Sequence, residues 1–186
     1  MYKDLSGKTA LVTGSGKKTG IGYAVAEKLA SNGANIIIAD MGALARTQSE
    51  VSTGSGNEMA AIVSELKDRF KVDAMSVDVD VTNGETIASM AEAVKVRFGK
   101  VDVLVNNAGA SFGVPNAFLY YDEAAWMRTI DVNLHGAFRV SRAIIPMMPP
   151  SITPGSSSCT NTTPRAISPW IVSSVLAGEY GAGEPV

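Results

Sequence analysis

The chain reads TGSGKKTGIG from Thr13 to Gly22, between a short apolar run and a segment with helical spacing. The run before it, Thr9 to Thr13, is TALVT, and an apolar run that ends at a glycine is typical of a strand buried on both faces. After it, apolar residues recur at the spacing of a helix, and Asn32-Gly33 supplies a stop signal. The apolar residues are Ile21, Ala24, Val25 and Leu29. The stretch therefore predicts a strand, a tight turn and a helix.

A second buried strand is predicted directly after this helix. Asn35 to Asp40 reads NIIIAD, so that strand, helix and strand fall within about 30 residues, the size of one βαβ unit. In such a unit, glycines let backbone N–H groups approach a pyrophosphate, and the helix N-terminus adds partial positive charge. Asp40 ends the second strand at about the distance where an acidic residue meets the ribose hydroxyls. The pattern predicts a dinucleotide site, against the alternative that these are only structural turn glycines.

The alternation of strands and helices continues beyond a loop predicted from Met41 to Gly56. The further predicted elements are a helix carrying Met59, Ile62, Val63, Leu66 and Phe70, a strand from Asp73 to Val79, a helix carrying Ile87, Met90, Ala91, Val94 and Phe98 that Gly99 stops, a strand from Val101 to Val105, a helix from Glu123 to Met148 and a strand from Trp170 to Ser174. This order predicts an α/β fold of the Rossmann type, a doubly wound parallel sheet in three α/β/α layers, formed as one domain over residues 1–186. Six of the eight prolines lie between Pro146 and Pro169, so residues 149–169 are expected to be a flexible insertion.

The composition narrows the choice of partners. The 16 lysines and arginines are balanced by 18 acidic residues, which gives no basic stripe of the kind that binds nucleic acid. Cys159 is the only cysteine, so neither an internal disulfide nor a Cys/His metal site is expected. No apolar run approaches the roughly 20 residues that cross a bilayer. We expect a cytoplasmic protein without membrane, nucleic-acid or metal partners.

Several motifs in this order resemble the signatures of the short-chain dehydrogenase/reductase family. They are Thr13-Gly14, Gly20-Ile21-Gly22, Asp80-Val81, Asn106-Asn107-Ala108-Gly109 and Asn133. The resemblance implies that the glycines contact a nicotinamide dinucleotide, that Asp80 and Val81 hold its adenine, and that Asn107 to Gly109 support the sheet beside it. The cofactor-binding residues predicted in this way are Gly14, Ser15, Gly16, Thr19, Gly20, Ile21, Gly22, Asp40, Asp80, Val81, Asn107, Ala108 and Gly109. Five residues, where the family usually has three, separate Gly14 from Gly20, so the loop is expected to bulge.

The choice between NAD and NADP depends on opposing charges. Asp40 would accept hydrogen bonds from both ribose hydroxyls and repel a 2′-phosphate, which favours NAD. Lys17 and Lys18 could neutralise such a phosphate, or could be no more than a solvated pair in the loop. NAD is therefore the favoured cofactor, and NADP is the alternative.

The resemblance also implies the catalytic groups. The family uses a tyrosine as general acid/base, a lysine four residues later, a serine at the reacting oxygen and an asparagine in a proton relay. Asn133 and Ser174 match the last two, unless they are an exposed helix residue and a strand-end serine without function. None of Tyr2, Tyr23, Tyr120, Tyr121 and Tyr180 is followed four residues later by lysine. We expect the sequence to stop just before the catalytic pair, with the last strands and helices of the fold missing.

Three function classes follow. The first is an NAD(P)-dependent oxidoreductase, present as a fragment or truncated form, that transfers hydride between the cofactor and a small alcohol or carbonyl compound, and full-length relatives are commonly homo-oligomers. The second is a non-catalytic dinucleotide-binding module. The third, a methyltransferase or other Rossmann enzyme, has no use for the Asn-Asn-Ala-Gly motif.

His135, the only histidine, lacks a nucleophile at recognisable spacing and is expected to be structural.

Overall fold

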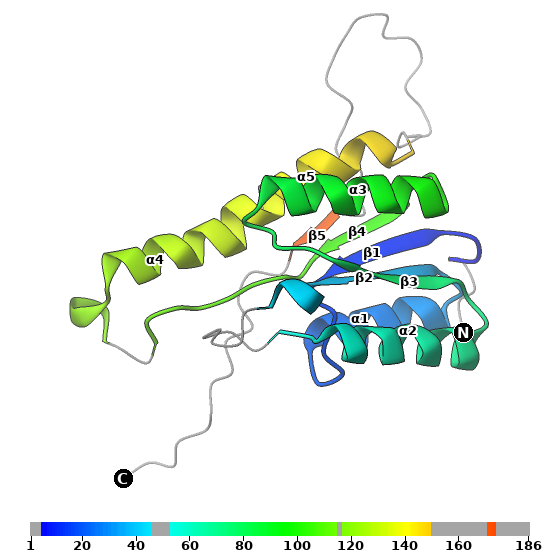
Figure 1. The fold of residues 1–186 in the computed structure, drawn as a ribbon, viewed down its shortest axis with the longest axis horizontal. Helices are drawn as coiled ribbons and strands as arrows, with labels where there is room; N and C mark the ends of the chain where they lie inside the picture. Colours follow the sequence, from blue (N-terminus) through cyan, green and yellow to red (C-terminus); the bar gives the residue numbers. More distant parts are fainter. Residues whose placement is uncertain (1–4, 46–52, 115–116, 150–170, 174–186) are drawn as a thin grey trace, which may run out of the picture.

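A computed structural model describes residues 5–45, 53–114, 117–149 and 171–173 (Figure 1). Its centre is a five-stranded parallel sheet with the strand order β3-β2-β1-β4-β5. The strands are β1 (Thr9–Thr13), β2 (Asn35–Asp40), β3 (Ala74–Asp78), β4 (Val103–Asn106) and β5 (Ile171–Ser173). The chain builds outward from β1 to β3 and then returns to place β4 on the other side of β1, which creates a topological switch point between β1 and β4.

Helices cover both faces of the sheet. α1 (Ile21–Ser31) and α2 (Gly56–Phe70) lie on one face, and α3 (Gly84–Phe98) and α5 (Ala137–Ile144) lie side by side on the other (Figure 1). α4 (Glu123–Ile130) precedes α5 and extends beyond the sheet. The predicted three-layer, doubly wound α/β fold is confirmed.

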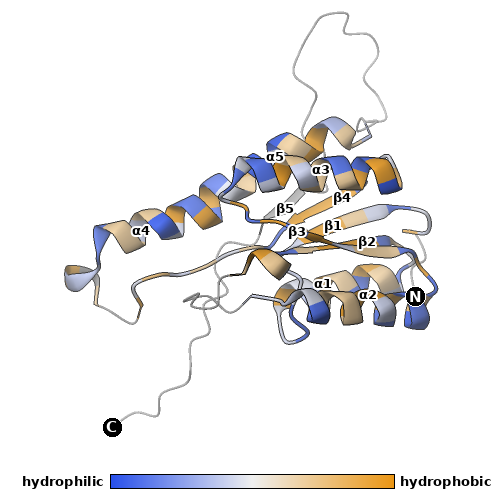
Figure 2. Cartoon of the chain, viewed as in Figure 1, coloured by the Kyte–Doolittle hydropathy of each residue, from blue (hydrophilic) through white to orange (hydrophobic). Residues whose placement is uncertain are grey.

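The alternation of side chains along the central strands explains why the sheet is buried on both faces. In β2, Ile36 and Ile38 pack with α1 and α2, whereas Ile37 and Ala39 pack with α3 and α5. All four side chains are 0% exposed. A strand that is apolar at every position therefore supplies both cores, and Figure 2 shows the apolar colour concentrated on the strands and the inner faces of the helices.

Local signals account for the helix boundaries. The Ser55 hydroxyl accepts a hydrogen bond from Glu58 N, and the Asn83 side chain accepts one from Glu85 N, so each caps a helix N-terminus. Gly99 ends α3 with a φ of +72°, as the sequence predicted. Lys71 ends α2 in the left-handed region, with a φ of +58°, where no glycine marked the end.

The structure corrects several predicted boundaries. β4 is Val103–Asn106, where Val101 to Val105 was predicted, and β3 is Ala74–Asp78, where Asp73 to Val79 was predicted. A 3-10 turn, η1 (Gly42–Leu44), lies inside the predicted loop.

The helix predicted from Glu123 to Met148 is not one regular α-helix. It runs as α4, a π-helical stretch η3 (Asp131–Gly136), α5, and a final 3-10 turn η4 (Ile145–Met147) with Pro146 inside it. The 3-10 turn tolerates Pro146 because the α-helical bond pattern has already ended.

The fifth predicted strand is present as Ile171–Ser173, parallel to β4. Ser174 and nearly all of the predicted insertion at 149–169 lie outside the described residues. Within the described part of the chain, no helix combines the length and the apolar character needed to cross a membrane.

Candidate functional site

Two turns meet at the carboxyl edge of the sheet, at the switch point. The glycine loop, residues 14–20, follows β1, and the turn Asn107–Gly109 follows β4. Because β1 and β4 are adjacent and parallel, both turns leave the sheet at the same edge. Open α/β sheets bind ligands in the crevice at this position.

Asn107 ties the two turns together. Its Nδ2 donates hydrogen bonds to the carbonyl oxygens of Thr13 and Gly14, each at 2.9 Å. In return the Thr13 hydroxyl oxygen accepts from the backbone N–H groups of Asn107 and Ala108, each at 3.0 Å. Thr13 is 1% exposed. These four bonds fix the turn after β4 against the start of the glycine loop.

Close packing requires glycine at Gly14 in the loop and at Gly22 in the first turn of α1. Gly14 has a φ of +65°, and a Cβ there would lie 2.7 Å from Ala108 Cα. A Cβ on Gly22 would lie 2.5 Å from Asn107 Nδ2 and would also overlap the Gly14 carbonyl. Helix α1 therefore begins in direct contact with both turns.

The N-terminus of α1 is free of negative charge. Gly20 is its N-cap and provides no side-chain cap, and the first turn contains no acidic residue. An uncapped helix N-terminus presents backbone N–H groups and a partial positive charge to an anion. The glycines at the switch point and this helix start together fit the pyrophosphate of a dinucleotide.

Asp40 lies at the end of β2, as predicted, but its carboxylate is enclosed. Oδ2 accepts a hydrogen bond from Gly16 N and Oδ1 accepts one from Met41 N, each at 2.7 Å. Gly54 N also donates to this carboxylate. Burial raises the pKa of Asp40 above its usual 3.8, and the three backbone donors offset only part of that effect.

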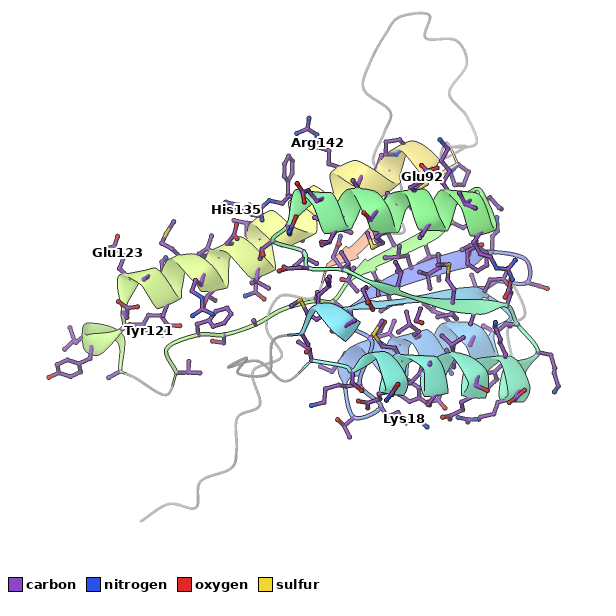
Figure 3. The ribbon with its side chains drawn as sticks, viewed as in Figure 1. Lys18, Glu92, Tyr121, Glu123, His135 and Arg142 are labelled. Atoms are coloured by element: carbon purple, nitrogen blue, oxygen red, sulfur yellow. The ribbon has the colours of Figure 1, made fainter. Side chains whose placement is uncertain are left out.

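The glycine loop bulges towards α2. Lys18 N donates to Glu58 Oε1 at 3.0 Å, and Lys18 Nζ pairs with Glu65 Oε2 at 2.5 Å. Figure 3 shows Lys18 on the outer side of the α1–α2 layer, away from the sheet. This arrangement favours the interpretation of Lys18 as a surface residue over that of a clamp for a 2′-phosphate.

Asp80 and Val81 follow β3 and have different surroundings. Asp80 Oδ1 accepts hydrogen bonds from the Thr82 N–H and hydroxyl, at 2.8 and 2.7 Å. Val81 is 8% exposed, and a Cβ on Gly136 would lie 2.8 Å from Val81 Cγ2. Val81 therefore links the turn after β3 to the π-helical stretch.

Asn133 stands within that stretch and holds the segment after Asn107–Gly109. Its Nδ2 donates to Ala110 O at 2.6 Å and to Thr129 O at 2.8 Å, and its Oδ1 accepts from Ala110 N at 3.2 Å. A Cβ on Gly109 would lie 2.6 Å from Asn133 Oδ1. The π-helical geometry and the tight approach place this amide beside the turn after β4.

Two further residues singled out in the sequence are Ser174 and His135. Ser174 lies outside the described residues. His135 Nδ1 is 3.3 Å from Asp131 Oδ1, which also accepts from Arg139 at 2.7 Å. The pairing with Arg139 lowers the pKa of Asp131. In the described part of the chain no group of three or more His, Cys, Asp or Glu side chains could hold a metal ion.

The sequence reasoning missed the anchors of the glycine loop. Glu58 carries one available signal, because Ser55-Gly56-Asn57-Glu58 has the spacing of a capping box at the start of a helix. Gly54 and Glu65 carry no comparable signal for the loop, since Gly54 lies against Gly16, 38 positions away, and Glu65 pairs with Lys18, 47 positions away.

Known proteins resemble this chain in sequence. The profile of the short chain dehydrogenase family matches residues 8–158. Glucose 1-dehydrogenase 2 of Bacillus subtilis is 35% identical over 147 residues, which cover 78% of this chain and 50% of the relative. The short chain dehydrogenase pigC of Monascus ruber is 36% identical over 145 residues, which cover 78% of this chain and 44% of the relative.

Solved structures show the same likeness. The L-sorbose reductase of Gluconobacter frateurii, solved with NADPH and L-sorbose, has a TM-score of 0.64 at 32% identity over 80% of this chain and 50% of its own. An NAD+-bound xylitol dehydrogenase has a TM-score of 0.64 at 29% identity over 77% of this chain and 48% of its own. The chain spans about half the length of the curated relatives it matches. The match to the family profile, together with the fold, shows that the chain belongs to the short-chain dehydrogenase family.

Proposed function

We propose that the protein is an NAD(P)-dependent oxidoreductase that transfers hydride between a nicotinamide cofactor and a small alcohol or carbonyl compound. The observation that carries the proposal is the pairing of the Asn107 amide with the carbonyls of Thr13 and Gly14. It joins the glycine loop to the turn after β4 at the switch point, where a Rossmann fold binds a dinucleotide. The cofactor supplies the hydride chemistry when bound, and the chain binds and orients it.

Each turn has a separate task in this proposal. The glycine loop and the first turn of α1 bind the pyrophosphate through backbone N–H groups, which the uncapped helix start supports. Asp80 and Val81 border the adenine. Asn107, Ala108 and Gly109 form the wall beside the nicotinamide half.

Two residues are proposed for the proton relay and the reacting oxygen. Asn133 holds the segment after Gly109 through its paired hydrogen bonds with Ala110. Its role is to position the nicotinamide side of the site and to support proton transfer. Ser174, next to the end of β5, hydrogen-bonds the reacting oxygen of the substrate.

A second candidate is a dinucleotide-binding module without turnover. None of the five tyrosines in the sequence has a lysine four residues later. We therefore assign dinucleotide binding to the residues described above. Hydride transfer, in the oxidoreductase proposal, also requires the tyrosine and lysine of the family.

Binding is tested by calorimetric titration of the 186-residue chain with NADH and with NADPH. We expect saturable binding of at least one of them, and its loss in Gly22→Ala, in which the new Cβ would overlap Asn107. Failure of a chain with folded circular dichroism to bind either nucleotide would overturn the proposal.

Turnover is tested by incubating the chain with reduced cofactor and a panel of ketones, aldehydes and sugars. Oxidation of the cofactor supports the oxidoreductase, whereas binding without oxidation supports the module for this chain. Sequencing the transcript past the codon for Val186 shows whether a Tyr-x-x-x-Lys follows, which the oxidoreductase proposal requires.

A further inference from the structure

We infer that Glu58, in the first turn of α2, is a specificity-determining residue that disfavours a 2′-phosphate on the bound dinucleotide and so favours NAD over NADP. The inference rests on the proposed dinucleotide site and adds a second carboxylate, next to Asp40, at its adenosine end. Asp40 keeps the role that the sequence predicts for it, at the ribose hydroxyls.

The first argument is that the two carboxylates bind the same short loop. Asp40 Oδ2 accepts a hydrogen bond from Gly16 N at 2.7 Å. Glu58 Oε1 accepts one from Lys18 N at 3.0 Å, two residues further along the loop. Met59, the neighbour of Glu58, packs at the same point, because a Cβ on Gly16 would lie 2.9 Å from Met59 Cγ and 2.8 Å from Asp40 Cβ. Asp40 and Glu58 therefore border the glycine loop together.

The second argument is that the two carboxylates interact through their charges. The negative charge of Glu58 adds to the effect of burial, which is the larger cause of the raised pKa of Asp40. Like charges near a protein surface repel one another without direct contact, and salt screens the repulsion. A 2′-phosphate carries about two negative charges at neutral pH. Glu58 would therefore repel it in addition to Asp40.

The third argument is the difference between the two helix starts that adjoin the loop. α1 begins without a side-chain cap and without an acidic residue in its first turn. α2 begins with the Ser55 side chain as its cap and with Glu58 in its first turn. A helix start attracts an anion by its partial positive charge, and a carboxylate in the first turn offsets that attraction. The pyrophosphate is thus favoured at α1, while the start of α2 gives little support to a further phosphate group.

The loop also contains two lysines, and their charges need to be considered. The positive charge of Lys18 is offset on α2, because Nζ pairs with Glu65 Oε2 at 2.5 Å. Lys17 is the other cation of the loop. It is the same in the wild type and in the variants below, so differences between these proteins do not arise from it.

The experiment measures the affinities for NAD+ and NADP+ by calorimetric titration of the wild-type chain and of Glu58→Gln. Glutamine keeps an oxygen that can accept from Lys18 N and removes only the charge. At low ionic strength we expect NADP+ to bind about 3 to 10 times more tightly to the variant, and NAD+ to stay within about twofold. The gain should shrink in about 0.5 M salt, which the loss of a merely structural contact would not do.

Three results of these titrations would overturn the inference. They are an unchanged ratio of the two affinities, a change of both affinities by the same factor, and a gain for NADP+ that does not depend on salt. The second of these would mean that Glu58 only holds the loop.

Glu85→Gln is the matched control, because Glu85 is an exposed acidic residue in the first turn of α3, on the other face of the sheet (Figure 1). The substitution removes the same charge from the same position in a helix. We expect the ratio of the two affinities to stay within about twofold of the wild type. A shift as large as that of Glu58→Gln would contradict the inference, since it would report only the net charge of the protein.

A measurement without nucleotide separates this inference from the proposed function. In an NMR titration, the pKa of the Asp40 carboxyl should be lower in Glu58→Gln than in the wild type and unchanged in Glu85→Gln. If the pKa falls in this way but neither nucleotide binds, the dinucleotide site fails and the interaction of the two carboxylates stands. If neither nucleotide binds and the pKa is unchanged, both fail.

Discussion

At the residue scale, Asn107 shows why the position requires an amide. Nδ2 supplies two N–H groups to two carbonyl oxygens, at 2.9 Å each, which no carboxylate or hydroxyl can do. Asn107→Asp keeps the shape, removes both donors and places a negative oxygen against two carbonyls. We expect the free energy of unfolding in urea to fall by about 1–3 kcal/mol and dinucleotide binding to be lost.

The control for this prediction is Asn57→Asp, the same chemical change at an exposed position in the first turn of α2. A negative charge there is favourable towards the helix dipole, so stability should stay the same or rise by a few tenths of a kcal/mol. Equal effects of the two substitutions would show that the Asn107 pairing contributes nothing specific.

The second prediction at the residue scale concerns Gly22, where a larger side chain would clash sterically. A methyl group there would overlap the Gly14 carbonyl and lie 2.5 Å from Asn107 Nδ2. We expect Gly22→Ala to lower the free energy of unfolding by about 1–3 kcal/mol, the usual cost of overpacking, and to shift α1 away from the loop. Thermal and urea unfolding followed by circular dichroism measure the change.

Gly84→Ala is the matched control, because Gly84 also lies in the first turn of a helix and a Cβ there meets nothing within 4 Å. Alanine should stabilise α3 by up to about 1 kcal/mol through its helix propensity. A stable Gly22→Ala variant that binds dinucleotide normally would contradict the tight junction.

The residues of this site could be predicted to different degrees. Gly14 and Gly22 are marked in the sequence because a strand precedes the turn and glycines mark the turn itself, whereas Asn107 was indicated by the resemblance to the family motif. The enclosure of Asp40 could not be predicted, since its donors Gly16 and Gly54 lie 24 residues before it and 14 after it and carry no side chain that would indicate a partner. Backbone donors leave little trace in a sequence.

At the element scale, Glu65 connects α2 to α1 and to the glycine loop. It accepts hydrogen bonds from Lys18, Arg69 and Tyr23, and these, with Lys18 first, lower the pKa of its carboxyl from 4.5 to about 2. A depressed pKa in the folded state means that the pairing stabilises the protein above pH 4.5 and that this contribution is lost as the pH falls towards 2.

The corresponding prediction is that Glu65→Gln lowers the free energy of unfolding at neutral pH by about 0.5–1 kcal/mol, a modest value because the side chains are partly exposed and screened by salt. The difference from wild type should shrink as the pH falls from 4.5 towards 2 and in high salt. Urea unfolding across this pH range measures it.

Glu92→Gln, at an exposed position on α3, serves as the control and should stay within about 0.5 kcal/mol of the wild type at every pH (Figure 3). A constant difference for Glu65→Gln across the pH range would show that its carboxylate charge does not hold the loop.

Prediction of the elements from sequence also has a physical limit. β1 and β2 were predicted with their observed bounds because their apolar runs end abruptly at Gly14 and Asp40. The π-helical stretch at Asp131–Gly136 was not predicted, since it keeps an apolar pattern close to that of an α-helix. Within it, Asn133 forms hydrogen bonds with Ala110, 23 residues earlier, which the local pattern does not reveal.

At the scale of the whole molecule, the sheet separates two cores that only the strands share. Ile36 and Ile38 belong to the core under α1 and α2, and Ile37 and Leu104 to the core under α3 and α5. The switch point lies between β1 and β4, and Asn107 and Thr13 link the turns that follow these two strands. A dinucleotide bound there would contact the turns on both sides of the switch point.

The last prediction follows from that position. A ligand that binds only the folded state stabilises it by about 2.7 kcal/mol at a concentration 100 times its Kd. We expect NADH or NADPH at that excess to raise the free energy of unfolding by this amount and to slow amide exchange both in the glycine loop and at Ala108 and Gly109. AMP, which carries only the adenosine half, should slow exchange in the loop alone. If the complete dinucleotide slowed amide exchange only in the glycine loop or only at Ala108 and Gly109, a site that spans the switch point would be contradicted. The pyrophosphate and nicotinamide ends would then not reach both turns.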